Sequence, residues 1–466
     1  MTMNEGYKPI KIIRREDISN PVAEKQETRP ELPEISLQHE LREKGGEYIP
    51  SGSWWYWNMV DGKPIDDKTK AEMLLAQKEE LPYMVSAVLE RACNLSCNHC
   101  LYQDEKSSRE ASIKGRLSEV IEHMVSNMPK ASEDTGGKRN PEPEFLSGGR
   151  ILRPWHLDLF KNLRDVRPDV KIGMIDNGTF TKLLAKWPEG LKMDWIDISI
   201  DGTEEHHNEQ RGSTNAYSEA IHGLMRAREI IRPRSEGGYV ASLMTLTNIN
   251  AGDVPKVADV LFEESGGEPL ADKLNLTTMG PTNAVNTELE MRVQDLAQAW
   301  DGIKKASAKY NTPTNQRVSL RLYRIEDLEK LATIVGEKKF LESFPDNEQE
   351  ARERVSFRGN FIETNIDGIL VSYLPVSIWP PEELLIEADG AYRVAYEGQF
   401  TLDELRDGKS KDGRNTGSYT VAQLTPETDF REVYEKAVDH YWQYFGHKKL
   451  DNEFATFQRI REKASK

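Results

Sequence analysis

The three cysteines of this 466-residue chain lie within eight residues, as Cys93, Cys97 and Cys100 in the spacing C-x3-C-x2-C. Thiolates are soft ligands, and three of them on one loop can bind iron or zinc. Because they are odd in number and clustered, they argue against a disulfide framework and for a reducing compartment. Three ligands also leave one position of a tetrahedral zinc or of a [4Fe–4S] cluster without a thiolate. We therefore expect a metal site that a distant side chain completes or that stays open for chemistry.

The net charge of −16 and the pI of about 5.3 argue against nonspecific binding to nucleic acid or to an anionic membrane, because such surfaces require a basic footprint. No apolar run approaches the roughly 18 residues of a membrane span. The first 19 residues are charged and lack the apolar core of a secretory signal. These features predict a cytoplasmic protein with neither a nucleic-acid nor a membrane partner.

Strand and helix patterns alternate after residue 83. Alternation of this kind predicts a parallel sheet with right-handed crossovers, and hence an α/β fold with a partial (β/α)6 TIM-like barrel. Functional residues of such barrels lie at the carboxyl ends of the strands. The expected strands cover 84–89, 145–147, 171–175, 195–200, 239–247 and 273–279, with helices over 117–125, 155–160, 216–230 and 253–264.

Changes in pattern divide the chain into an N-terminal extension (1–80), the barrel (81–285) and an α+β C-terminal cap (286–466). The first 50 or so residues of the extension are rich in Lys, Glu and Pro, and the aromatic run Trp54 to Trp57 follows them within it. These rings either contact a substrate or, more commonly, hold the extension on the main domain. In the cap we expect helices over 287–309, 325–343, 429–445 and 452–463. We also expect a hairpin that turns at Asp367-Gly368.

The cysteine spacing, with His99 before the last thiol, resembles the cluster loop of the radical S-adenosylmethionine (SAM) superfamily. The resemblance implies that Cys93, Cys97 and Cys100 hold a [4Fe–4S] cluster beside His99, and that SAM binds the fourth iron. The alternative from another class is a non-catalytic zinc-binding protein with a remote fourth ligand.

Three further segments resemble SAM-contacting segments of the same superfamily. Gly148 and Gly149 follow the second strand where the family has Gly-Gly-Glu, but here Arg150 replaces the glutamate, so only backbone contacts carry over. Asn177 lies in a segment similar to the family's Thr-Asn-Gly, although a simple β-turn explains it equally well. Ser199 and Arg211 match a pattern of relatives of peptide- and sulfatase-maturing enzymes (SPASM/twitch-related), which implies that they bind the ribose or the carboxylate of SAM.

The segment 357–379 resembles the cap of those relatives, but it contains no cysteine. Auxiliary clusters are therefore excluded, and redox-neutral elimination or rearrangement is favoured over thioether formation and cluster-dependent oxidation. Short stretches at 365–373 and 424–430 resemble the aminosugar deaminase and aminoglycoside dehydratase branch.

The resemblance implies a radical SAM enzyme in which a 5′-deoxyadenosyl radical abstracts hydrogen from a small polar substrate. The substrate expected is a sugar or aminoglycoside undergoing dehydration or deamination, and a flavodoxin or ferredoxin would supply the electron. Tyr217, His206 and Glu209 are the candidate acids or bases. A peptide-modifying enzyme is the alternative. The sequence leaves open the substrate, the oligomeric state and whether SAM is consumed or regenerated.

Overall fold

The structure of the chain is a computed structural model. It describes residues 55, 58–63, 65–79, 84–89, 93–100, 114–128, 143–148, 152–179, 183, 186–231, 238–263, 268–279, 288–345, 350, 362–375, 383–388, 390–395, 418–442 and 446–466. Some predicted helix and strand boundaries lie outside the described residues. So do five residues named above, which are Trp54, Tyr56, Trp57, Gly149 and Arg150.

Twelve strands of the described residues form one sheet, in the order β12-β11-β10-β1-β2-β3-β4-β5-β6-β7-β9-β8. The strands from β10 through β1 to β7 and β9 are parallel, whereas β8, β11 and β12 pair antiparallel at the two edges. No pairing among the described strands joins β12 to β8, so the barrel is partial, and the predicted fold class is confirmed.

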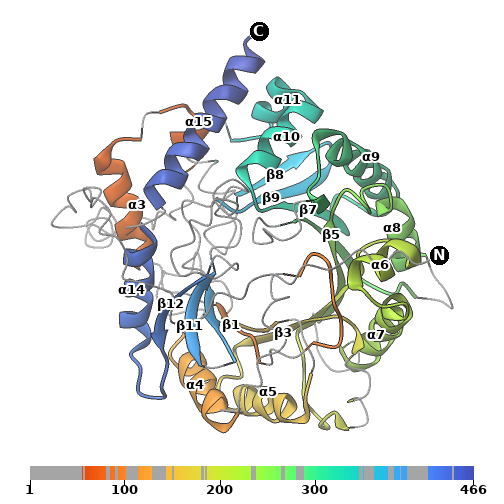
Figure 1. Ribbon diagram of the computed structural model, residues 1–466, viewed down its shortest axis with the longest axis vertical. Coiled ribbons are helices and arrows are strands. Elements are labelled where there is room, and N and C mark those ends of the chain that lie inside the picture. The colour runs from red at the N-terminus through yellow and green to blue at the C-terminus, as the bar shows by residue number, and fades with distance from the viewer. Residues whose placement is uncertain are drawn as a thin grey trace, which may run out of the picture.

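The six predicted parallel strands are present as β1 Met84–Ala87, β2 Glu144–Ser147, β3 Lys171–Asp176, β4 Trp195–Ser199, β5 Tyr239–Leu246 and β6 Lys273–Thr278. Helices alternate with them along the chain and lie on the outer side of the curved sheet (Figure 1). These are α4 Lys114–Ser126, α5 Pro154–Val166, α6 Glu204–Arg211, α7 Ala216–Ile231, α8 Val254–Phe262 and α9 Val293–Tyr310.

The residues after 286 add strands to both ends of this sheet, which the sequence patterns did not predict. Strand β7 (Val318–Leu322) pairs with β6 and is followed by β9 (Ile369–Tyr373) and β8 (Ile362–Ile366). At the other end β10 (Glu383–Ile386) pairs parallel with β1, and β11 (Ala391–Ala395) and β12 (Ser418–Gln423) follow. The expected cap therefore continues the sheet of the barrel.

Two local predictions in this part have clear outcomes. Asp367 (φ 57°) and Gly368 (φ 79°) connect β8 to β9 with positive φ at both positions, which confirms the predicted hairpin turn. The single helix expected over 325–343 is instead two, α10 (Ile325–Val335) and α11 (Glu337–Glu342). Gly336, with φ 91°, ends the first helix, because a right-handed helix cannot continue through positive φ.

The segment before the sheet packs on the C-terminal helices α14 (Phe430–Tyr441) and α15 (His447–Ala464). Trp55 is fully buried and donates its Nε1–H to Glu453 at 2.8 Å, and the Tyr373 hydroxyl donates to the same carboxylate at 2.7 Å. In α3 (Asp67–Glu79) the Gln77 carbonyl accepts from the Tyr434 hydroxyl at 2.5 Å. These contacts give Trp55 a packing role, which is the commoner of the two interpretations of the aromatic run.

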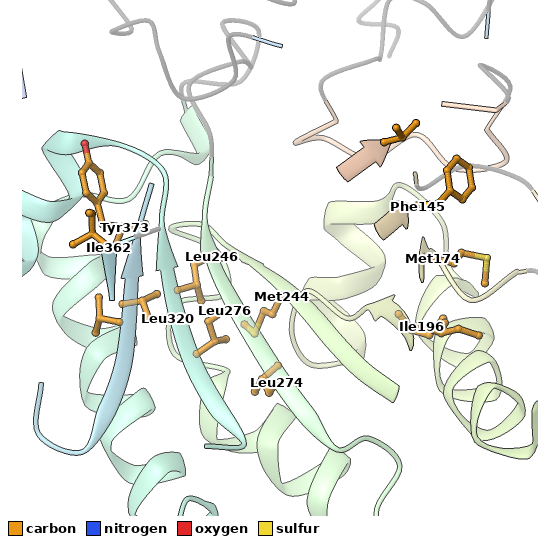
Figure 2. Close-up of a cluster of buried hydrophobic side chains, with 14 of the residues drawn as sticks. Phe145, Met174, Ile196, Met244, Leu246, Leu274, Leu276, Leu320, Ile362 and Tyr373 are labelled. Atoms are coloured by element: carbon orange, nitrogen blue, oxygen red, sulfur yellow. The ribbon is translucent and has the colours of Figure 1, made fainter. Parts of the chain in front are cut away.

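One face of the sheet is apolar and packs on the helices, and Figure 2 shows ten of its residues across the strands. Because side chains alternate along a strand, only every second residue belongs to this face. On β4 these are Ile196 and Ile198, and both are fully buried. The labelled members of this face are Phe145, Met174, Ile196, Met244, Leu246, Leu274, Leu276, Leu320, Ile362 and Tyr373.

The alternate residues of the same strands form the opposite face, which we call the polar face. The strand registers place polar side chains side by side on it. Its polar members are Ser86, Glu144, Asp197, Ser199, Thr245, Asn275, Thr277, Ser319, Arg321 and Ser372. The same alternation therefore separates a surface that stabilises the fold from a surface rich in hydrogen-bonding groups.

Aromatic rings cross the polar face at the amino ends of the strands. Trp195 lies over Gly173, where an added Cβ would be 1.9 Å from the indole, and its Nε1 contacts the Glu144 carboxylate. Trp195 stacks on Tyr239 with centroids 6.2 Å apart, and the Lys273 ammonium lies 4.5 Å from the Tyr239 ring centroid. These side chains occupy the amino-terminal part of the polar face. The polar groups that remain on this face lie toward the carboxyl ends of the strands.

Candidate functional site

The predicted site residues gather at the carboxyl ends of the parallel strands. The cysteine segment follows β1, Gly148 follows β2, Asn177 follows β3, and Ser199 ends β4. Since neighbouring strands are parallel, these ends share one edge of the sheet. The expected placement of the functional residues is thereby met in the described part of the chain.

The cysteine loop binds the carboxyl end of α6. The last carbonyls of a helix have no partner within it, and here the loop supplies the donors. Ser96 N donates to the Arg211 carbonyl at 3.2 Å, and Asn98 N donates to the Gln210 carbonyl at 2.7 Å. The Asn98 side chain adds a bond to the Glu209 carbonyl at 3.2 Å. The loop is therefore fixed by backbone groups more than 100 residues away in the sequence.

Gly212 makes this contact possible. It ends α6 in the left-handed conformation, with φ 62°, which residues with a Cβ rarely adopt. A Cβ at this position would also lie 2.6 Å from the Ser96 carbonyl oxygen. Both the turn and the close approach of the loop require glycine.

The three thiols belong to one small cluster with Leu95 and Ala216. None of the three forms a disulfide, and Cys97 is buried whereas Cys93 and Cys100 are half-buried. Burial raises the pKa of the Cys97 thiol, and the nearby Arg211 guanidinium opposes this rise. Within the described residues, no three Cys, His, Asp or Glu side chains already surround a common point as a metal site. The donor set of three thiols on one loop nevertheless fits a thiophilic metal or an iron–sulfur cluster.

A buried ion pair joins this loop to the end of β4. Arg211 Nε donates to Asp201 Oδ2 at 2.5 Å, and Arg211 Nη1 lies 3.8 Å from Cys97 Sγ in hydrogen-bonding geometry. His99 Nε2 is 3.6 Å from the same Asp201 oxygen. Burial alone would raise the pKa of Asp201, but Arg211, His99 and the Thr245 amide together hold it below its usual value. No functional role for Asp201 was predicted from the sequence, because its partners lie on α6 and β5.

Further buried polar groups support the pair. His207 Nδ1 accepts from the Asp201 amide at 2.9 Å, and Asn250 Nδ2 donates to the Asp201 carbonyl at 2.8 Å. The Thr247 hydroxyl donates to Gln210 Oε1 at 2.7 Å. Burial, together with the Arg211 charge, lowers the pKa of His207 to about 4, so that it is neutral near pH 7. His207, Gln210 and Asn250 carried no sequence signal, because their partners lie on other strands and helices.

Two candidate SAM contacts have defined positions. Gly148 N donates to the Ala87 carbonyl at 3.0 Å, which continues the pairing of β2 with β1. Asn177 Nδ2 donates to Asn94 Oδ1 at 3.0 Å, and so links the end of β3 to the cysteine loop. Asn177 Oδ1 also accepts from the Thr179 amide at 3.0 Å, as in an Asx-type turn. Asn177 thus combines a turn with a contact to the loop.

Ser199 and Asp197 lie on the polar face of β4, on the same side as Asp201. Both are buried. Asp197 Oδ2 accepts a long bond from Asn275 Nδ2 at 3.4 Å, while Asp197 Oδ1 has no partner among the described residues. Burial raises the pKa of Asp197 to about 6, and Asn275 and the Arg321 charge oppose this rise. No role for Asp197 was predicted from the sequence, because a strand pattern shows only which residues alternate between the two faces.

The candidate acids and bases lie on α6 and the start of α7. His206 Nδ1 is 2.6 Å from Asp253 Oδ2, which also accepts from the Thr203 amide at 2.9 Å. Tyr217 packs edge-on against His207, with centroids 5.8 Å apart, and burial raises the pKa of its phenol. Glu209 is exposed. The structure therefore places the three on one helical region, each in a different environment.

The sequence matches no protein-family profile. It is 24% identical over 198 residues to Fe-coproporphyrin III synthase of Methanosarcina barkeri, which covers 42% of this chain and 45% of that protein. It is 24% identical over 176 residues to pre-heme d1 synthase of Dinoroseobacter shibae, covering 38% and 39%. Both relatives are radical SAM enzymes. The resemblance to the radical SAM superfamily is confirmed. The matches span less than half the length of each relative.

Solved structures of the superfamily are similar at low identity. Streptococcus suis SuiB bound to the precursor peptide SuiA has a TM-score of 0.45 and 11% identity, covering 82% of this chain and 77% of that chain. The enzyme anSMEcpe with bound AdoMet has a TM-score of 0.45 and 15% identity, covering 82% and 99%. HydG, a maturase of the [FeFe]-hydrogenase, has a TM-score of 0.35 and 12% identity, covering 61% of this chain and 66% of that chain.

Proposed function

We propose that this protein is a radical SAM enzyme that carries a [4Fe–4S] cluster on Cys93, Cys97 and Cys100. The observation that carries the proposal is the position of three thiols, none of them in a disulfide, on one loop at the carboxyl edge of a parallel sheet. When bound, the cluster and SAM supply a reductive cleavage that yields methionine and a 5′-deoxyadenosyl radical. The protein holds the loop in place through the carboxyl end of α6 and limits the access of water to it.

For SAM we propose contacts at the same edge of the sheet. The backbone of Gly148 and Gly149, the side chains of Asn177 and Ser199, and the neighbouring His99 are the candidates. Gly148 has no side chain, and an added Cβ would meet only the Ala87 carbonyl, at 3.7 Å, so its backbone is open to a ligand. Arg211 contacts Asp201 and Cys97 in the structure, and we propose for it a role different from binding the SAM carboxylate.

The substrate proposed is a small polar molecule that contacts the polar face of the sheet. Asp197 supports this proposal, because its buried Oδ1 has no partner within the described ranges and so can accept a hydrogen bond from a ligand. A hydroxyl or ammonium group would donate that bond, as in a sugar or aminoglycoside undergoing dehydration or deamination. Tyr217, His206 and Glu209 remain the proposed acids or bases, and a flavodoxin or ferredoxin the proposed electron donor.

Two other substrate classes are carried as alternatives. Both sequence relatives are named for porphyrin or heme products, which favours a porphyrinoid substrate. A peptide is the alternative that the sequence pattern around Ser199 suggests.

No helix in the described part of the chain is long and apolar enough to cross a bilayer. We propose a cytoplasmic location.

Anaerobic reconstitution with iron and sulfide tests the proposal. The wild-type chain should bind about four irons and cleave SAM under dithionite, and Cys97→Ala should abolish both. Ser218→Ala, which changes an exposed residue of α7, is the matched control and should retain both. A colourless protein that binds one zinc per chain would instead establish the non-catalytic zinc-binding alternative.

The substrate class is tested by deuterium transfer into 5′-deoxyadenosine from labelled aminosugars, peptides and iron coproporphyrin. The class that transfers deuterium is the substrate class. Asp197→Asn should lose substrate-dependent transfer while it retains cleavage of SAM without substrate. Equal transfer by Asp197→Asn and wild type would contradict the role proposed for this carboxylate.

A further inference from the structure

Arg211 is the one cation that the structure places directly on a thiol of the cysteine loop within the described residues. Its guanidinium has two contacts, Nε to Asp201 Oδ2 at 2.5 Å and Nη1 to Cys97 Sγ at 3.8 Å. Arg211 is 8% exposed and Asp201 is fully buried. Two charges this deeply buried are costly to desolvate, so both contacts must be kept for the fold to tolerate them.

The direction of the guanidinium is fixed on both sides. Asp201 Oδ1 accepts from the Thr245 amide at 2.9 Å, and the Asp201 amide donates to His207 at 2.9 Å. Rotation of the carboxylate would therefore break its contact to Thr245 of β5, while the amide contact to His207 of α6 holds the backbone of Asp201 in place. At the other end, the Arg211 carbonyl accepts from Ser96 N, one residue before Cys97. Backbone and side chain of Arg211 thus hold the same short stretch of the loop.

We propose that Arg211 is a positioning residue that raises the reduction potential of the cluster by donating a hydrogen bond to the Cys97 sulfur. The inference rests on the cluster proposed above. Hydrogen bonds to the ligating sulfurs and the net charge nearby are two of the factors that set the potential of an iron–sulfur cluster. The added electron comes from an external one-electron donor and increases the negative charge on the thiolate sulfurs. An N–H donor at one sulfur stabilises that reduced state.

The electrostatic field of α6 at the cysteine loop explains why a cation is needed beside Cys97. The carboxyl end of α6, which carries the negative end of the helix dipole, contacts the loop at Ser96 and Asn98. Without a cation, that end would oppose the addition of an electron to the cluster. Arg211 is the last residue of α6, and its charge lies where it can offset that field.

The test is an EPR-monitored redox titration of the reconstituted protein, with dithionite as reductant. Arg211→Gln should lower the potential, so that at a fixed solution potential the ratio of reduced to oxidised cluster falls at least tenfold, which is 59 mV for one electron. Arg211→Lys, which keeps the charge but loses the planar fork, should give a smaller decrease. An unchanged potential in Arg211→Gln overturns the proposal.

Arg167 provides a matched control. It is 6% exposed, and it donates to the carbonyls of Val125 and Met128 at 2.9 and 3.0 Å, away from the cysteine loop. Arg167→Gln should lower the melting temperature as Arg211→Gln does, but should leave the potential unchanged. An equal shift in both variants would show general loosening of the fold and would overturn the specific role of Arg211.

Asp201→Asn supplies a measurement that does not depend on the folding of Arg211→Gln. It keeps the guanidinium and removes the opposing negative charge, so the potential should rise, opposite in sign to the effect of Arg211→Gln. No rise would contradict the proposal. Failure of the wild type to bind iron would instead refute the proposed cluster, so the iron content separates the two failures.

Discussion

Strand β4 has two faces with opposite roles. Ile196 and Ile198 lie on one, are fully buried and pack on the helices, whereas Asp197 and Ser199 lie on the other, with Asp201 immediately beyond the strand. Both faces are buried to a similar degree, but only the first is apolar. The comparison teaches that burial in this fold serves two purposes, which are cohesion on the helix side and the placement of polar groups on the concave side.

The difference has a thermodynamic consequence. Buried apolar side chains stabilise the fold in proportion to the area removed from water. A buried carboxylate with an unpartnered oxygen destabilises it, and natural proteins retain such groups mainly where activity needs them. Substitutions on the two faces of β4 should therefore change stability in opposite directions.

The largest effect is expected on the apolar face. Ile196→Ala should destabilise the protein by about 2–5 kcal/mol, because it removes buried methyl groups and leaves a cavity. Urea denaturation of the apo protein measures the change. Leu274→Ala, on the same face of β6 (Figure 2), should have a comparable cost, and a cost below 1 kcal/mol for both would show that this face is not the core.

Asp197→Asn should stabilise the protein above pH 6. The folded-state pKa of Asp197, about 6, lies above the value of 3.8 for an exposed aspartate, so the folded state binds the proton more tightly than the unfolded state. The stability gained by binding this proton is fully present below pH 4 and is lost as the pH rises through 6. Asparagine does not titrate, so the variant does not lose this stability as the pH rises. At pH 8 its free energy of unfolding should exceed that of the wild type by at most about 3 kcal/mol. Melting temperatures of both proteins between pH 4 and pH 8 measure it; a less stable variant at pH 8 would mean that the carboxylate is paired.

His207 should give a pH dependence of the opposite sign. Its folded-state pKa of about 4 lies below the value of 6.5 for an exposed histidine, so the unfolded state binds the proton more tightly than the folded state. Its contribution to stability is present above pH 6.5 and is lost as the pH falls toward 4. His207→Gln keeps an acceptor for the Asp201 amide and removes this term, which is at most about 3 kcal/mol. The variant should therefore lose less stability than the wild type between pH 7 and pH 4; an identical acid profile would contradict the assignment.

The smallest effect is expected at Gly212. Gly212→Ala places a Cβ in left-handed backbone, which costs about 1–2 kcal/mol, and brings it against the Ser96 carbonyl. Because the strain falls on the cysteine loop, iron binding should weaken more than global stability. Gly368→Ala is the control, since it has a positive φ of 79° but open space around it. If both variants bind iron equally well, the close approach at Ser96 is not needed.

Local sequence patterns were enough for much of the fold. The six parallel strands, most of their helices, and the hairpin at Asp367-Gly368 follow from alternation, helical periodicity and turn chemistry, which depend on residues close in the chain. The cysteine spacing was sufficient to recognise the resemblance to the radical SAM superfamily, to which both curated relatives belong. The addition of β10 beside β1 was not predictable in this way, because the pairing of Met84 with Glu383 joins segments about 300 residues apart.

The sequence by itself singled out the candidate metal ligands, since all three thiols lie in one short segment. Only the tertiary structure decided what surrounds them. Arg211 pairs with Asp201 and Cys97, and one carboxylate oxygen of Asp197 has no partner in the part of the chain that the structure describes, because strands and helices distant in the chain meet at one edge of the sheet. The energy of a buried charge depends on the neighbours that folding brings to it, and a linear pattern does not contain them.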